Sequence, residues 1–362
     1  MLRDPVTFSS EGGPGRTGGG TILDDLPRGV GPGVMLNMMD PPRHTALRLL
    51  VGQGFKPRTV AALEPDLRAR THALLDAVAA RGRCDFLREV AAELPLQVIA
   101  SLLDVPAEDR HRIFEWTNAF VDYADRDLGQ SSERLREAGA GIAAYGRALL
   151  ARKRARPGED MLSQVIGAEL PDDSGTPRRP TDEELLPFLS LLLVAGSETT
   201  RNAIAGGLLA LVHHPEQMEE LRRAVAVGDA AVVASAVEEI LRWTSPTAYN
   251  RRTATRDVEL GGQRIRAGDK VTHWYPSANR DEAVFSDPFH FDVRRQPNAH
   301  LAFGHGAHHC LGASLARTEI RVLFEELLPR WGEIELDGPV EWTRSNKHTG
   351  VRHLPVRFRA LR

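Results

Sequence analysis

One loop constrains this chain more than any other stretch: the glycine-rich segment from Phe303 to Gly312. It carries Cys310, one of only two cysteines in the 362 residues. Apolar residues recur at helical spacing from Ala313 onwards, so Cys310 is expected at or just before the N-terminus of a helix. The free N–H groups and positive dipole of a helix end favour a thiolate over a thiol. Because glycine permits close approaches that a side chain blocks, the loop predicts a thiolate held near a large, flat group.

Three interpretations compete for this cysteine. A lone cysteine is often a buried structural residue that behaves as a small hydrophobe. The second interpretation is a zinc site, although three adjacent residues cannot all reach one tetrahedral ion. Its candidate ligands are His300, His305, His308, His309 and Cys310. The third interpretation is a thiolate ligand to haem iron.

The loop closely resembles the haem-binding loop of the cytochromes P450, Phe-Gly-x-Gly-x-His-x-Cys-x-Gly, without a gap. The matching residues are Phe303, Gly304, Gly306, His308, Cys310 and Gly312. Cytochromes P450 are the standard example of thiolate-ligated haem, so the resemblance implies that Cys310 binds the iron of haem b (iron protoporphyrin IX). It also implies that Phe303, His308 and Gly312 contact the cofactor.

Composition narrows the class of protein. The chain is 42% hydrophobic, which suits one large domain with an ample core. Lys and Arg number 46 against 49 Asp and Glu, so the net charge of −3 does not indicate a nucleic acid partner. Two cysteines give no disulfide framework, which is typical of a reducing cytoplasm. The apolar run from Leu185 to Gly196 is too short to cross a bilayer, and the N-terminus does not look like a signal peptide. We expect a cytoplasmic protein without a membrane partner.

A second motif lies inside the longest predicted helix. Thr181–Glu184 is a capping box, and the helical pattern continues to His213, with Pro187 either kinking the first turns or marking a later start. The central run is apolar nearly all round, so this helix is expected to cross the core. Glycine, acid and hydroxyl residues interrupt it at Ala195–Thr200. Their cost in helix propensity and solvation indicates a functional site.

This interruption resembles the oxygen-activation motif of the cytochromes P450, Ala-Gly-x-Asp/Glu-Thr. The resemblance implies that Ala195 and Gly196 lie against the cofactor and leave room above the iron. It implies that Thr199 and Glu198 are catalytic, because a buried hydroxyl and carboxyl can carry the protons that O–O cleavage requires. The alternative is a threonine bonded to its own helix backbone and a glutamate that reaches solvent.

Two basic segments extend the resemblance. His44 and Arg48 lie four residues apart on one helix face, in a stretch similar to the one that binds haem propionates in the family. A solvated basic face is the alternative for such a pair. Arg252 matches the propionate-binding arginine of the family, with neighbouring Arg251 as the second choice. The alternating sequence around them, Thr247–Leu260, predicts strands.

Glu239 and Arg242 lie three residues apart on a further predicted helix and look like the structural Glu-x-x-Arg pair that supports the haem loop. The family often adds an arginine from a Pro-x-Arg-Phe segment. The corresponding Pro288–Phe291 carries His290 at that position. We therefore expect this network to depend on pH more than usual.

The resemblance implies one fold and one activity. The fold is mainly α with a smaller β region (α+β), as a single cytochrome P450 domain over residues 1–362 that lacks the N-terminal helix and first strands of the family. The activity is that of a haem-thiolate monooxygenase that uses O2 to hydroxylate or epoxidise a hydrophobic small molecule, such as a steroid, terpenoid or polyketide. Because no flavin or nicotinamide fingerprint is present, electrons are expected from a ferredoxin and a ferredoxin reductase. We expect a monomer, with a mobile lid at residues 122–130.

The resemblance also locates the surfaces for substrate and redox partner. Pocket walls are expected from Val34–Met39, Leu192, Ala195, Thr247–Asn250 and Asn346–Gly350. The last of these turns is polar, which indicates an oxygenated substrate. A basic face for an acidic ferredoxin is expected from Lys56, Arg58, His305, His309, Arg317 and Arg321, with ordinary surface charge as the alternative. Two other functions remain open: a haem protein without turnover, and a peroxide-driven enzyme, against which Glu198 and Thr199 argue.

Overall fold

The computed structural model describes residues 1–121, 132–171 and 175–361, so the predicted lid at residues 122–130 lies outside the described residues. Helices make up most of this part of the chain. The α-helices are α1 (Arg43–Val51), α2 (Pro57–Ala62), α3 (Glu64–Ala79), α4 (Glu93–Leu102), α5 (Arg110–Val121), α6 (Glu133–Ala155), α7 (Met161–Gly167), α8 (Asp182–His213), α9 (Pro215–Val227), α10 (Ala230–Thr244), α11 (Tyr275–Ala278) and α12 (Ala313–Arg330). Short 3-10 or π turns occur at η1 (Leu36–Met38), η2 (Gly52–Phe55), η3 (Leu87–Ala91), η4 (Ala107–Asp109) and η5 (Gly306–His308).

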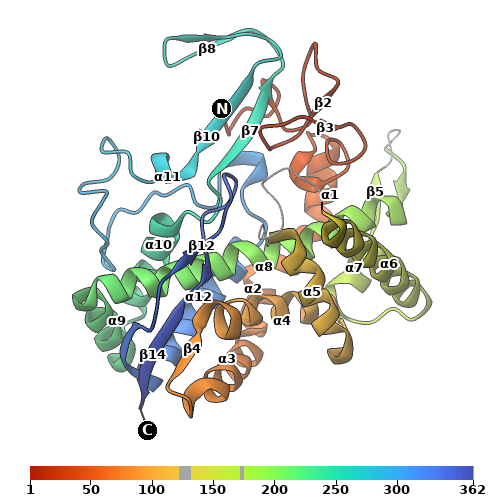
Figure 1. Cartoon of the computed structure of the whole chain (residues 1–362). Helices are drawn as coiled ribbons and strands as arrows, with labels where there is room; N and C mark the ends of the chain where they lie inside the picture. The colour runs from red at the N-terminus through yellow and green to blue at the C-terminus, as the bar shows by residue number, and fades with distance from the viewer. Residues whose placement is uncertain (122–131, 172–174, 362) are drawn as a thin grey trace.

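Helix α8 is the central element, and Figure 1 shows it crossing the molecule. The predicted capping box is present, because the Thr181 side chain accepts from the third helical residue and the Glu184 carboxylate accepts the Thr181 N–H at 3.0 Å. Pro187 lies within the helix and does not mark a later start. One continuous apolar core surrounds α8, with α4, α10 and α12 packed against it. The prediction of a long core-crossing helix is confirmed.

Two three-stranded antiparallel sheets join parts of the chain that are distant in sequence. The first has the order β1 (Phe8–Ser9), β7 (Tyr249–Ala254) and β10 (Lys270–Trp274), and the second β11 (Trp331–Leu336), β14 (Pro355–Ala360) and β4 (Arg83–Asp85). Phe8 lies opposite Ala254, and Cys84 lies opposite Val356. Buried Cys84 is therefore a structural residue of the second sheet.

Four two-stranded pairs complete the β region. They are β2 (Gly18–Gly19) with β3 (Leu26–Pro27), β5 (Leu170–Pro171) with β6 (Pro177–Arg178), β8 (Val258–Leu260) with β9 (Gln263–Ile265), and β12 (Glu341–Trp342) with β13 (Val351–His353). Three of these strands, β1, β2 and β3, lie within the first 33 residues, which are rich in glycine. Helices with a smaller β region confirm the α+β prediction. No helix among the described residues is both long and apolar enough to cross a membrane.

Candidate active site

Cys310 lies on a tight turn in front of α12. Its N–H donates to the carbonyl of Phe303 at 2.8 Å and closes the loop. Gly304 and Gly306 have φ values of +69° and +74°, a region that only glycine adopts without strain. A Cβ atom at Gly306 would also lie 2.2 Å from the carbonyl oxygen of Leu2. Both glycines are therefore needed to present the cysteine in this position.

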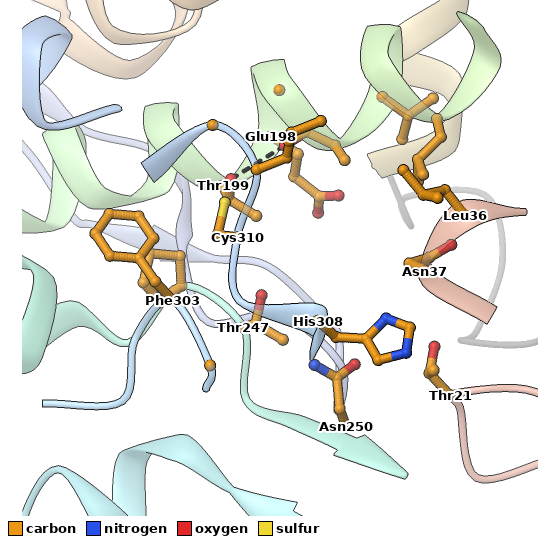
Figure 2. A pocket seen from close by; sticks show the side chains of 18 of the residues that line it. Thr21, Leu36, Asn37, Glu198, Thr199, Thr247, Asn250, Phe303, His308 and Cys310 are labelled. Carbon is orange, nitrogen blue, oxygen red and sulfur yellow. Dashed lines mark hydrogen bonds between the residues drawn. The ribbon is translucent and has the colours of Figure 1, made fainter. Parts of the chain in front are cut away.

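A cavity of about 910 Å³ lies between this loop and α8. Figure 2 shows Cys310, Thr199, Glu198 and His308 around the same space. The wall is apolar over much of its area and carries a few polar side chains, as is usual for a small-molecule site. The apolar residues include Leu36, Ile99, Phe188, Leu191 and Leu192, and the polar ones include Thr21, Asn37, Thr247 and Asn250. The predicted pocket walls are thus brought together.

Cys310 is exposed to the cavity, although the protein around it desolvates its sulfur. Burial raises the pKa of the Cys310 thiol, while the Gly312 N–H, Arg48 and Arg317 act to lower it. The helix end acts in the predicted direction, because the Gly312 N–H favours the thiolate, but desolvation of the sulfur outweighs this effect. A thiol that coordinates a metal ion loses its proton outright, so a bound metal would supply what the helix end does not.

The histidines near Cys310 turn to separate partners. Nε2 of His300 lies 3.0 Å from the carboxylate of Glu238. Nε2 of His308 lies 3.1 Å from the hydroxyl of Ser10. No group of three or more His, Cys, Asp or Glu side chains in the described ranges could hold a metal ion. The zinc interpretation is therefore not supported by the geometry.

Four basic side chains border the cavity from separate elements: His44, Arg48, Arg252 and His308. The rings of His44 and His308 have centroids 4.1 Å apart. Burial lowers the pKa of His44 to about 4 and that of His308 to about 3, and the nearby arginines act in the same direction. Cationic and neutral donors thus gather here with little negative charge.

This basic cluster fits an anionic cofactor. His44 is 1% exposed, and its Nδ1 has no hydrogen-bond partner in the part of the chain that is described. Arg48 and Arg252 donate to backbone carbonyls, and neither lies within 4.0 Å of a carboxylate of the described residues. Arg251 instead pairs with Asp25 at 2.5 Å. A buried cation without an anion is costly, so carboxylates of a ligand would complete the cluster.

Glu198 and Thr199 combine features of both interpretations of the α8 motif. The Thr199 hydroxyl donates to the carbonyl of Ala195 at 3.0 Å, as expected for a threonine bonded to its own helix. Glu198, in contrast, does not reach solvent. It is 4% exposed, and Oε1 of its carboxylate lies 2.9 Å from Nδ1 of His348. Glu198 and Thr199 both line the cavity, where they could hold or pass a proton.

Ala195 and Gly196 both line the cavity, and Gly196 has a packing role as well. Ala195 lines the cavity and is exposed to it. A Cβ atom at Gly196 would lie 2.7 Å from Cδ1 of Ile99 on α4. The glycine is therefore required by the packing of α4 against α8, which sequence analysis did not anticipate. Gly312 has open space around the position of a Cβ atom, consistent with a group lying against it.

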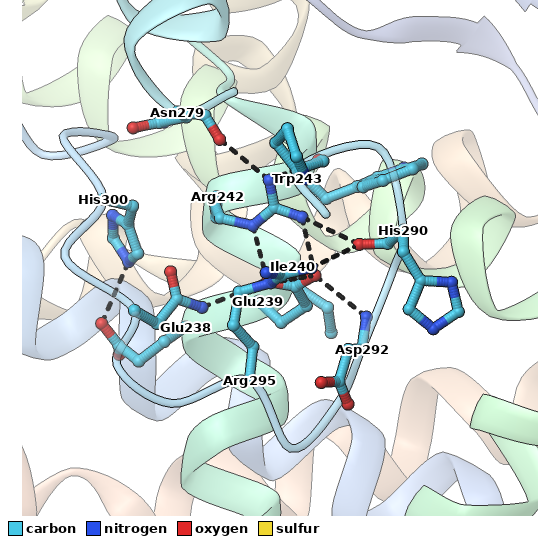
Figure 3. Close-up of polar contacts among 12 residues, drawn as sticks. Glu238, Glu239, Ile240, Arg242, Trp243, Asn279, His290, Asp292, Arg295 and His300 are labelled. Atoms are coloured by element: carbon cyan, nitrogen blue, oxygen red, sulfur yellow. Dashed lines mark hydrogen bonds and ion pairs between the residues drawn. The ribbon is translucent and has the colours of Figure 1, made fainter. Parts of the chain in front are cut away.

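A buried ion network supports the Cys310 loop. Glu239 and Arg242 on α10 are fully buried, and two guanidinium nitrogens donate to the carboxylate at 2.7 and 2.8 Å. The third partner is Arg295, whose Nε lies 3.2 Å from both carboxylate oxygens. Figure 3 shows that His290 offers its backbone carbonyl to both arginines while its ring points away. The expected pH dependence through the His290 side chain is therefore wrong.

The network reaches the loop through Asn279. Arg242 donates to the carbonyl of Asn279 at 2.8 Å, and the side chain of Asn279 accepts the N–H of Leu301 at 2.7 Å. Leu301 lies just before the loop of Cys310. Sequence analysis missed Arg295 because it lies outside the expected Pro-x-Arg-Phe segment; the Arg294-Arg295 pair was the available signal.

The six residues expected at the ferredoxin face differ in whether their side chains already pair with another residue. Lys56 and Arg58 are exposed, and neither forms an ion pair with a described residue. Arg317 pairs with Glu238 at 2.6 Å. Of the remaining three, Arg321 pairs with Glu64 at 2.5 Å, His305 accepts from Arg3 at 2.8 Å, and His309 contacts Phe303. The positive charge of this face thus rests mainly on Lys56 and Arg58.

Residues 81–351 match the family model described as Cytochrome P450. The chain belongs to the cytochrome P450 family. Members of this family are haem proteins, and the basic cluster and the cavity of this chain fit that cofactor. The family also accounts for the arrangement of helices and strands described above, since the closely similar solved structures share it.

Several cytochromes P450 are similar to this chain. A Mycobacterium tuberculosis protein named cytochrome P450 126 is 51% identical over 360 residues, covering 99% of this chain and 84% of that protein. A methyl-branched lipid omega-hydroxylase of M. tuberculosis is 42% identical, covering 88% and 73%. A steroid C26-monooxygenase of Mycolicibacterium smegmatis is 38% identical, covering 90% and 73%. The structure of a Mycobacterium marinum cytochrome P450 with pseudoionone has a TM-score of 0.86 at 34% identity, covering 98% and 83%. This cytochrome P450 is a monooxygenase that acts with O2 on a hydrophobic substrate.

Proposed function

We propose that this cytochrome P450 binds haem b through the thiolate of Cys310 and oxidises a lipid-like substrate with electrons from a ferredoxin. One observation carries the proposal. The cysteine sulfur faces a cavity that is bounded across from it by Thr199 and Glu198. Four basic side chains border the same cavity, and none of them pairs with a carboxylate of the described residues. That arrangement would provide a thiolate to bind the iron, basic side chains to hold the propionates and a polar α8 wall in one space.

The residues have separate roles in this proposal. Haem bound to a cysteine thiolate supplies activation of O2 and cleavage of the O–O bond. The propionates are held by His44, Arg48, Arg252 and His308. Phe303 and Gly312 contact the cofactor from the loop, and Ala195 and Gly196 do so from α8. Thr199 and Glu198 hold the protons that the reaction consumes and pass them into the cavity.

We propose that the substrate is a steroid, terpenoid, polyketide or branched lipid and that the protein hydroxylates or epoxidises it. The apolar wall of Leu36, Ile99 and Leu192 supports it, and so do the names of the lipid and steroid enzymes that are similar to this chain. The polar turn at Asn346–His348 also lines the cavity, which favours a substrate that carries an oxygen. Lys347 is engaged there, because its amino group donates to the Tyr249 carbonyl at 2.7 Å.

The experiment is an absorption spectrum of the dithionite-reduced protein with carbon monoxide. We expect the far red-shifted Soret band that a thiolate ligand gives, and its loss in Cys310→Ser. A band at the ordinary haem–CO position in the unsubstituted protein, or no haem at all, would overturn the proposal. A panel of branched lipids and steroids, screened by the spin-state shift of the ferric protein, then tests the substrate class.

A ferredoxin and its reductase are the proposed electron source, with Lys56 and Arg58 as the docking charges. We also propose that residues 1–362 form one domain and that the protein acts as a cytoplasmic monomer. Arg58→Glu should slow reduction by ferredoxin and leave reduction by dithionite unchanged. Unchanged ferredoxin kinetics in this variant would contradict the docking proposal without touching the assignment of Cys310.

A further inference from the structure

The turn of residues 345–350, called here the His348 turn, is fixed by its own hydrogen bonds. The hydroxyl of Ser345 accepts the N–H groups of Lys347 and His348, both at 3.1 Å. The amino group of Lys347 donates at 2.7 Å to the side chain of Asn250 on β7. A turn bonded in this way holds its side chains in defined positions.

The same turn is also anchored to the core. The N–H of Thr349 donates to the carbonyl of Pro246 at 3.0 Å. The Thr349 hydroxyl donates to the backbone carbonyl of Thr244 at 2.8 Å. A Cβ atom at Gly350 would lie 2.5 Å from the side chain of Asn202 on α8. This close approach brings the His348 turn directly against the helix that carries Glu198.

His348 is the partner of Glu198 across this contact. Its Nδ1 lies 2.9 Å from Oε1 of Glu198, and the two side chains are 18% and 5% exposed. Nδ1 makes no hydrogen bond to a described residue, and the two groups meet at the distance of an ion pair, which forms when the ring carries a proton. Lys347 also faces this carboxylate: burial lowers the pKa of Lys347 to about 7, and the charge of Glu198 acts to raise it. A buried carboxylate needs such a partner, because burial without one favours its neutral form.

We propose that His348 is the positioning residue for Glu198: its imidazole pairs with the carboxylate and holds it ionised on the cavity wall. From there Glu198 accepts protons and passes them to the region of Thr199. This inference rests on the proposed role of Glu198 in proton delivery. It gives the polar turn a function beyond contact with substrate, since the turn then belongs to the proton path.

The test replaces His348 with glutamine, which keeps a polar side chain and removes the ring that can carry a positive charge. Three readouts are compared with those of the haem-loaded wild type: product formed per electron pair consumed, the solvent kinetic isotope effect, and the infrared band of a protonated carboxyl group. We expect coupling, the product formed per electron pair, to fall about three- to tenfold in H348Q, and the solvent isotope effect to rise. We also expect an infrared band of a protonated carboxyl group in H348Q that is absent from the double variant H348Q/E198Q. The double variant should be no less coupled than E198Q, because both changes interrupt one unit.

The matched control is His353→Gln, the same substitution on the adjoining strand β13. His353 pairs with Asp85 at 2.6 Å and does not line the cavity. Haem content and the far-UV circular dichroism of H348Q should equal those of this control, which separates proton delivery from misfolding. Wild-type coupling and no new carboxyl band in H348Q, with E198Q uncoupled, would overturn the inference. If E198Q itself stays coupled, the proposed role of Glu198 fails instead, while the infrared band still reports whether His348 is its partner.

Discussion

The Glu239 network permits a sharp prediction about stability. Glu239 accepts from Arg242 and Arg295, and these two guanidinium groups lie 0% and 8% exposed. Glu239→Gln keeps the shape of the side chain but leaves both cations without their anion. Breaking a buried ion pair from one side costs about 3–5 kcal/mol. At an unfolding entropy of about 2.1 cal/mol/K per residue, this chain should lose about 4–7 °C in Tm.

The assay is thermal unfolding followed by circular dichroism, with loss of the Soret band recorded in parallel. Glu220→Gln is the matched control, because Glu220 pairs with Arg294 at the surface, where such a pair contributes about 0–1 kcal/mol. His290→Ala should change stability by less than about 0.5 kcal/mol, since its ring is exposed and takes no part in the network. A Tm of E239Q equal to that of E220Q would refute the reasoning. A fall in H290A as large as that in E239Q would refute the assignment of Arg295 as third partner.

Three further predictions concern the cofactor site. Thr199→Ala should still bind haem and substrate but lower the yield of product per electron about tenfold or more. Hydrogen peroxide should rise by a matching amount. An unchanged yield of product per electron would contradict the role of Thr199 as a proton carrier. Arg252→Leu should raise the dissociation constant for haem about 10- to 100-fold, measured by haem transfer to apomyoglobin, because a charge-assisted hydrogen bond contributes about 1.5–3 kcal/mol. Haem-free protein should lose stability as pH falls from about 6.5 towards 4, measured by the urea midpoint. The folded-state pKa values of His44 (about 4) and His308 (about 3) lie below that of an unfolded histidine, so the unfolded chain binds protons first. A midpoint that is flat over this range would argue against burial of the two rings.

The parts of the fold that sequence could predict are those encoded locally. The capping box at Thr181 and the apolar run behind it specified α8, and the structure has that helix from Asp182 to His213. The glycine pattern around Cys310 specified a loop in front of a helix, and the left-handed residues Gly304 and Gly306 explain why those glycines are there.

The parts that sequence could not predict depend on contacts between distant segments. Arg295 joins Glu239 only because a long loop folds back over α10, and the Arg294-Arg295 pair in the sequence does not reveal that contact. The pKa of Cys310 is raised by burial, a tertiary property that outweighs the local effect of the helix end. The partner of Glu198 lies 150 residues away, on a turn that sequence analysis assigned to the substrate wall.

The strand pairing of the second sheet has a consequence for synthesis of the chain. Residues 83–85 in β4 pair with residues 355–357 in β14, so one edge leaves the ribosome long before its partner exists. Until β14 emerges, that edge is open to other chains, and the apolar surface beneath it is uncovered. We therefore expect slow growth at low temperature and added chaperones to increase recovery of the protein in a heterologous host. Removal of β14 should yield aggregated chains rather than a smaller folded unit.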